Sequence, residues 1–271
     1  MTRFIVAPQW QGSSSSRAMQ LIDGALAIAG DLPRATTTVI DVPAEAGESL
    51  ESGVRRLSSL TRVRTAIEEA VAAADEPVVI VGGDCGVTLA GVGAVAGPDL
   101  AVVWLDAHAD LNSPETSDSG AFHGMVLRAI LGEGADVLSL PAEVITPDRV
   151  VLAGTRQFDL GEELYVSATG MTALTVDDLA DPTALADAVA ATGAARVYIH
   201  VDLDVLDPGE MGALTHPVPF GATVAQVVAA IRAVRERMPL AGASLTEFSP
   251  SSPEAAVDDL GAILRLVGAL A

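Results

Sequence analysis

Short apolar runs alternate along the chain with longer, Ala-rich stretches in which apolar residues recur at helical spacing. This alternation is typical of an α/β protein, in which helices cover both faces of a parallel sheet. The pattern predicts strands at Phe4–Ala7, Thr37–Val42, Val78–Gly82, Ala101–Asp106, Arg149–Ala153, Ala195–Val201 and Ala241–Thr246. It predicts helices at Arg56–Ala74, Val87–Ala96, Gly124–Leu131, Pro182–Ala191, Val224–Met238 and Pro253–Leu270. Asp181-Pro182 and Ser252-Pro253 read as helix starts, because a capping residue precedes proline at each.

The sequence contains no internal repeat and no linker that would separate domains, so we predict a single α/β domain over residues 1–271. No apolar run approaches the roughly 20 residues that a membrane span needs. The N-terminal segment reads as a strand and lacks the long apolar region of a secretory signal. The single cysteine, Cys85, can form no internal disulfide, which agrees with a reducing compartment. We therefore expect a cytoplasmic protein.

Composition narrows the set of partners. The hydrophobic fraction of 50% excludes general disorder. The formal charge is −21, and all 15 basic residues are arginine. A surface this acidic repels nucleic acid and anionic membranes, so neither is expected as a partner. The same negative charge has three possible explanations: it keeps the protein soluble, it reflects a biased genome composition, or it attracts metal ions and cationic substrates.

Acidic side chains and a histidine follow directly after several predicted strands. In open parallel sheets, ligands bind at the carboxyl ends of strands, and there the chain carries Asp84-Cys85, Asp106-x-His108-x-Asp110, Asp202-x-Asp204 and Glu247. Because side chains alternate with a period of two, each Asp/His series lies on one face. A lone Asp at a strand end more often caps a helix or a turn. Carboxylates crowded at two such ends, however, need cations between them.

The mixture of ligand types indicates which cations would fit. Aspartate together with histidine suits Mn²⁺, Zn²⁺ or Fe²⁺ better than Ca²⁺. Several carboxylates can bridge ions, so two metals about 3.5 Å apart are expected, the spacing that generates a hydroxide nucleophile.

At these residues the chain resembles the arginase, agmatinase and formimidoylglutamase superfamily, and its arginase-like members most. The matching segments occur in family order: Gly82-Gly83-Asp84, Asp106-Ala-His-Ala-Asp-Leu-Asn112, His123-Gly124, Asp202-Leu-Asp-Val-Leu-Asp-Pro208, and Leu-Thr-Glu-Phe-Ser-Pro around Glu247. The resemblance implies a three-layer α/β/α fold with a central, mainly parallel sheet of about eight strands, in agreement with the alternation above. It also implies a homo-oligomer, commonly a trimer or hexamer.

The resemblance further implies two Mn²⁺ ions bridged by hydroxide. Asp106 and Asp202 would bridge both ions, and His108 and Asp204 would complete one site. Asp110 and the residue at position 85 would complete the other site.

Two further residues receive catalytic roles from the same resemblance. His123 would shuttle a proton to the departing amine, and Glu247 would anchor the guanidinium group of the substrate. These roles suit the chemistry, because a bidentate carboxylate orients a guanidinium and a histidine can protonate a leaving amine.

Position 85 departs from the family pattern, since it is cysteine where the family has a histidine ligand. A thiolate would favour Zn²⁺ or Fe²⁺ over Mn²⁺. Alternatively, Cys85 stays protonated and one metal site is weak or empty, or it is a packing residue beside a Gly-Gly turn. Two-metal occupancy therefore depends on this residue.

The substrate-binding residues come from the same comparison. Asn112 and Ser119 match arginase residues that hold the α-carboxylate, and Asp159 lies in a segment that loosely resembles the one near the α-amino group. Ala121 replaces a carboxylate-binding asparagine. His216 either reaches the pocket or, as we favour, is structural or solvent-facing. His200 shares a strand face with Asp202, and is either a partner of the metal ligands or a satisfied core histidine.

The leading hypothesis is hydrolysis of arginine or a related guanidino acid to urea and an amine by a metal-activated hydroxide. A formimidoylglutamase- or agmatinase-type reaction is the nearest alternative. A third hypothesis is a metal-poor, non-catalytic member that keeps the fold and binds a ligand. A carbohydrate or phosphate hydrolase is not supported, because the sequence has no phosphate-binding Gly-Lys loop.

Overall fold

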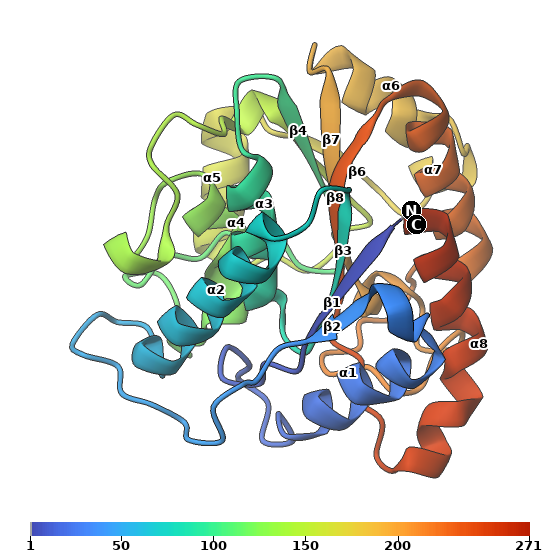
Figure 1. Cartoon of the computed structure of the whole chain (residues 1–271). Coiled ribbons are helices and arrows are strands. Elements are labelled where there is room, and N and C mark those ends of the chain that lie inside the picture. Colours follow the sequence, from blue (N-terminus) through green and yellow to red (C-terminus); the bar gives the residue numbers. More distant parts are fainter. Residues whose placement is uncertain (1) are drawn as a thin grey trace.

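The computed structural model describes residues 2–271. Its centre is an eight-stranded sheet in the order β2-β1-β3-β8-β7-β4-β5-β6, in which every neighbouring pair is parallel (Figure 1). The strands are β1 (Arg3–Ala7), β2 (Thr37–Val39), β3 (Val78–Gly82), β4 (Leu100–Leu105), β5 (Val150–Ala153), β6 (Thr172–Leu174), β7 (Arg196–Asp202) and β8 (Leu240–Thr246). The predicted α/β class with about eight mainly parallel strands is confirmed.

Helices cover both faces of this sheet and make it the middle of three layers (Figure 1). α1 (Gln20–Asp31), α6 (Ala184–Ala191), α7 (Val224–Arg237) and α8 (Pro253–Leu270) share one core with the sheet. α2 (Leu57–Ala72), α3 (Thr88–Val95), α4 (Val126–Ile130) and α5 (Leu160–Thr169) pack on the opposite face. Because both faces are covered, central strands are apolar throughout: every residue of β3 and β4 is buried.

The order of the strands in space differs from their order in the sequence, and this difference creates the site. β3 and β4 are consecutive in the chain, yet β8 and β7 lie between them. The carboxyl ends of β3, β8, β7 and β4 are therefore adjacent, although their residues come from widely separated parts of the sequence. An open parallel sheet binds its ligands at this edge, where the strand order reverses.

Several elements differ from the sequence prediction. α1 and α5 were not predicted, and neither was the short edge strand β6. The expected start at Asp181-Pro182 is also wrong by a few residues, because α6 begins at Ala184. Ser252 does cap α8, accepting a hydrogen bond from the backbone N–H of Ala255.

In the described part of the chain, no helix combines the length and apolar character that crossing a bilayer would need.

Candidate metal centre and substrate pocket

The four central strands each deliver a side chain that can bind a cation. Cys85 follows β3, Glu247 follows β8, Asp202 ends β7, and Asp106 follows β4. All four side chains are buried. The strand order, rather than proximity in the sequence, brings these predicted residues together.

Asp106, His108 and Asp204 form one cluster, in which one ligand atom of each residue lies within 4.8 Å of the others. His108 Nδ1 is 3.0 Å from Asp204 Oδ2 and 3.5 Å from Asp106 Oδ1. Each carboxylate is also fixed by the backbone, since Asp106 Oδ1 accepts from the N–H of His108 at 2.6 Å and Asp204 Oδ1 accepts from that of Ala107 at 3.0 Å. The cluster is therefore held in place before any ligand binds.

Cys85, Asp202 and Glu247 form a second cluster with the same 4.8 Å limit. The Cys85 thiol donates to Asp202 Oδ2 at 3.1 Å, and its Sγ lies 3.3 Å from Thr246 Oγ1. The other oxygen of Asp202 accepts from the N–H of Asp204 at 2.8 Å. Cys85 thus lies in the site, and its sulfur contacts a carboxylate that also belongs to the predicted ligands.

Burial and mutual repulsion make these carboxyl groups poor acids. Burial, aided by the charge of Asp204, raises the pKa of Asp106 to about 7. Burial and neighbouring carboxylates raise the pKa of Asp110 and of Asp202 well above the usual range. For His108, burial opposes protonation, but hydrogen bonds to Asp106 and Asp204 raise its pKa to about 11. Without cations, protonation of these carboxyl groups reduces the negative charge of the cluster.

The residues fit divalent cations. Several buried polar atoms have no hydrogen-bond partner in the region from residue 2 to 271, namely Asp110 Oδ2, His200 Nε2 and both carboxylate oxygens of Glu247. Such atoms are expensive to bury unless something binds them. Asp110 and Glu247 also have left-handed backbone angles, with φ of +52° and +69°. Strain of about 1–3 kcal/mol per such residue is characteristic of functional sites.

A pocket of about 240 Å³ opens onto this cluster. It is lined by Ser14, His108, Asp110, Asn112, Ser117, Asp118, Ser119, His123, Gly124, Gln157, Asp159, Glu162, Asp202, Asp204 and His216. Four predicted metal ligands, His108, Asp110, Asp202 and Asp204, therefore line one cavity with the predicted substrate-binding residues, whereas Asp106 and Cys85 do not line it. The cavity has room for a small molecule.

His123 lines this pocket and lies between two other polar groups. Its Nδ1 is 3.9 Å from Glu247 Oε1, and its Nε2 is 3.1 Å from Ser14 Oγ. The ring of His216 stacks on that of His123 with centroids 5.0 Å apart. Burial and the charges of His216 and His108 lower the pKa of His123 to about 3, so this imidazole is neutral at pH 7.

The predicted substrate end is organised by a residue that the sequence did not single out. Asn112 Nδ2 donates to Asp159 Oδ2 at 2.8 Å, and Ser119 lines the same pocket. Glu162 is buried and accepts from the N–H of Leu111 and from that of Asp159, both at 2.9 Å. Glu162 therefore connects the segment after β4 to the start of α5. The capping-box pair of Asp159 and Glu162 was the available sequence signal.

His216 and Ser14 also line the pocket. Our preferred interpretation of His216 as structural or solvent-facing is wrong about its position, because it lines the pocket. Ser14 Oγ lies 3.4 Å from His216 Nε2 and so connects the serine-rich segment to both histidines. Only a contact across 202 positions of sequence reveals this arrangement.

Comparisons with known proteins agree with the geometry. The model of the arginase family matches residues 10–265. The chain is 35% identical to an arginase of Bacillus caldovelox over 228 residues, which cover 78% of this chain and 76% of that protein. It is 36% identical to N(omega)-hydroxy-L-arginine amidinohydrolase of Streptomyces lavendulae over 220 residues, covering 77% and 74%.

Solved structures show the same fold. The crystal structure of the Bacillus caldovelox arginase superposes with a TM-score of 0.82 at 26% identity and covers 98% of both chains. An arginase from Entamoeba histolytica, in complex with L-ornithine, superposes with a TM-score of 0.85 at 21% identity, covering 99% of this chain and 97% of its own.

Proposed function

Since this chain belongs to the arginase family, we propose that it hydrolyses a C–N bond of L-arginine or a closely related guanidino acid, releasing urea and an amine. One observation carries the proposal. The pocket that His108, Asp202 and Asp204 line is also lined by Asn112, Ser119 and Asp159. A guanidino acid has a cationic group at one end and a zwitterionic group at the other, which matches this division.

Two divalent cations would be held by Asp106, His108, Asp110, Asp202 and Asp204, with Mn²⁺ the ion implied by the family. When bound, such cations lower the pKa of water so that hydroxide is available near neutral pH. Zn²⁺ or Fe²⁺ would be favoured if the thiolate of Cys85 also binds.

Glu247 would anchor the guanidinium. Its two carboxylate oxygens are buried and have no hydrogen-bond donor in the described region, so both are available for a bidentate contact. Burial, together with the charge of Asp84, raises the pKa of Glu247 well above its usual range. A cationic substrate would supply the missing positive charge and hold Glu247 ionised.

His123 would move the proton that the leaving amine requires. It is neutral in the free protein, and its Nδ1 faces Glu247, where the guanidinium would be held. A neutral imidazole can accept a proton as water is activated and then donate it to the departing nitrogen.

At the other end, Asp159 would pair with the α-amino group, and Asn112 and Ser119 would hold the α-carboxylate. The hydrogen bond from Asn112 to Asp159 fixes both side chains before substrate arrives. Such preorganisation reduces the entropy lost on binding.

The 36% identity to the Streptomyces lavendulae protein supports a second candidate, a guanidino acid with an N-hydroxy substituent. His216 stacks beside His123 and presents a polar ring to the pocket, where such a substituent could find a partner. Both candidates share the metal centre and differ only in the group beside these histidines.

The test is a urea-release assay on purified protein with added Mn²⁺. Arginine, N-hydroxyarginine and agmatine would be assayed for urea, and formimidoylglutamate for formamide. An Asp204→Asn variant serves as the control for metal dependence. Turnover of arginine or N-hydroxyarginine above agmatine supports the proposal. Bound metal with no turnover of any amidine would instead favour a non-catalytic binding protein.

A further inference from the structure

His200 is a buried histidine beside the metal-binding clusters, and the mechanism above does not use it. It lies on β7, two residues before Asp202, and its side chain has no solvent exposure. Its ring stacks on Trp104 of β4, with centroids 3.8 Å apart and an interplanar angle of 28°. Trp104 in turn donates from Nε1 to Asp106 Oδ2 at 3.1 Å. The ring is therefore fixed against the strand that carries Asp106.

The two ring nitrogens of His200 have different surroundings. Nδ1 lies 2.9 Å from Thr88 Oγ1 and 3.0 Å from Ser244 Oγ. Nε2 is buried and has no hydrogen-bond partner among residues 2–271. A metal-binding histidine typically shows this asymmetry, because one nitrogen is anchored by a polar neighbour while the other faces the ion.

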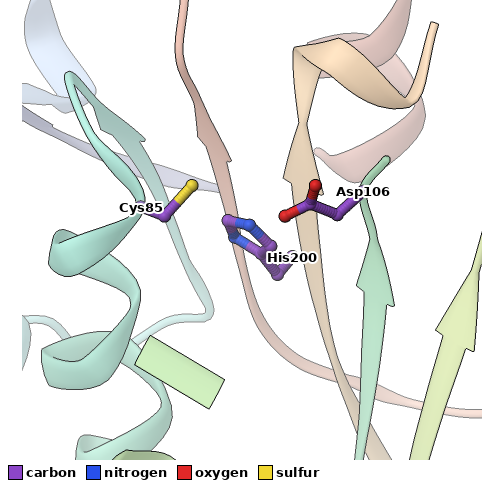
Figure 2. A group of neighbouring side chains, drawn as sticks. All are labelled: Cys85, Asp106 and His200. Atoms are coloured by element: carbon purple, nitrogen blue, oxygen red, sulfur yellow. The ribbon is translucent and has the colours of Figure 1, made fainter. Parts of the chain in front are cut away.

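Two possible metal ligands lie close to the His200 ring. Ligand atoms of His200, Cys85 and Asp106 lie within 4.8 Å of one another. Figure 2 shows the His200 ring between the thiol of Cys85 and the carboxylate of Asp106. Atoms that bind one cation at about 2.0–2.3 Å can be at most roughly 4.5 Å apart. The three atoms therefore lie at, or a few tenths of an ångström from, the spacing that a shared cation requires.

We propose that His200 Nε2 is the nitrogen ligand of a cation bound beside Asp106 and Cys85, a role for which position 85 offers only a thiol. This inference rests on the proposed function only in requiring that the centre bind divalent cations. The Cys85 thiol already donates a hydrogen bond to Asp202 Oδ2, so the His200 imidazole is the group that is left free to bind a cation. The imidazole would thus come from β7 rather than from the segment after β3.

A purely structural histidine would account for the stack on Trp104 and for the contacts of Nδ1. It would not account for a fully buried Nε2 without a partner, which is costly by about 1–3 kcal/mol. Cation binding explains all three features together.

The experiment compares metal binding in the wild type and three variants. The variants are His200→Ser, Cys85→Ser, and the double change Cys85→His with His200→Ser. Mn²⁺ content and affinity are measured, and pulsed EPR detects imidazole nitrogens coupled to Mn²⁺. His108 contributes a nitrogen in every protein and serves as the internal reference.

We expect two coupled imidazoles in the wild type and in Cys85→Ser, but only one in His200→Ser. Affinity should fall on the order of 100-fold or more in His200→Ser, beyond the 10–100-fold typical of residues that only support a ligand. The double variant should regain affinity, because an imidazole returns at position 85. Thermal unfolding of the metal-free proteins checks that each variant is folded.

The inference is overturned if wild-type Mn²⁺ couples to the imidazole of His108 alone, a result that needs no variant to fold. It is also overturned if folded His200→Ser keeps wild-type affinity. A wild type that binds no divalent cation would overturn both this inference and the proposed function. Bound metal with the second imidazole but no amidine turnover would overturn the proposed function alone.

Discussion

Replacing Glu247 by glutamine should stabilise the metal-free protein while removing most of its activity. Glu247 is buried, with both carboxylate oxygens unpartnered in the described region, and burial raises its pKa well above the ordinary glutamate value of 4.5. Below pH 4.5 the folded and unfolded states both hold the proton. As the pH rises, the unfolded state loses this proton while the folded state keeps it. The contribution of Glu247 to the free energy of unfolding therefore falls.

The magnitude follows from this linkage. Each pH unit between 4.5 and 7 lowers the stability of the wild type relative to the glutamine variant by at most about 1.36 kcal/mol. At pH 7, Glu247→Gln should therefore raise the free energy of unfolding by up to about 3 kcal/mol. Near pH 4 the difference should vanish. Two hydrogen bonds to a charged partner are worth about 3–6 kcal/mol, so kcat/KM should fall on the order of 10²–10⁴-fold.

The assay is denaturant unfolding in the presence of a chelator at pH 4, 5.5 and 7, together with urea release with Mn²⁺ at pH 7. Glu163→Gln is the matched control, because Glu163 is exposed on α5 and the chemical change is the same. It should alter neither quantity. If Glu247→Gln destabilises the protein at pH 7, or leaves kcat/KM near that of the wild type, Glu247 is not a buried anchor for the guanidinium.

Three further outcomes are expected. Burial raises the pKa of Asp106 to about 7 and those of Asp110 and Asp202 well above their usual range, so Mn²⁺ binding at pH 7 should release protons and weaken as the pH falls. Calorimetry in buffers of different ionisation enthalpy measures this proton release. A binding heat that does not depend on the buffer would contradict it. His123→Asn should lower kcat about 10²–10⁴-fold at unchanged metal content, and an unchanged kcat would exclude the proton-transfer role. Asp159→Ala should raise KM for arginine at nearly constant kcat; equal KM values would show that the α-amino group binds elsewhere.

Much of the candidate metal centre could be predicted from the sequence because its signal is local. Asp106, His108 and Asp110 directly follow a fully apolar strand, so the sequence places them together at its carboxyl end, although the segment bends and Asp110 is left-handed rather than extended. The central strands were likewise predictable, since burial on both faces requires continuous apolar runs.

Two helices lacked such a signal, for different physical reasons. α5 carries Leu160 and Leu164 on its exposed side, so its apolar residues do not mark the face that packs. α1 contains Gly24, which normally argues against a helix. In the structure the backbone of Phe248 lies against Gly24 so closely that any side chain there would collide with it. That requirement arises from a segment 224 positions away and is invisible locally.

The raised carboxyl pKa values at the site also depend on which strands are neighbours in the sheet. Asp106 and Asp202 are far apart in the chain, and either one alone could remain ionised at a solvated strand end. With β7 and β4 as neighbours, the charge of Asp106 helps to raise the pKa of Asp202. The fold thus places mutually repelling carboxylates at the edge of the sheet where the pocket opens. Bound protons or cations must reduce this repulsion. A proton on the unpaired nitrogen of His200 would find no hydrogen-bond acceptor among residues 2–271, whereas a cation can bind that nitrogen and the carboxylate of Asp106 together.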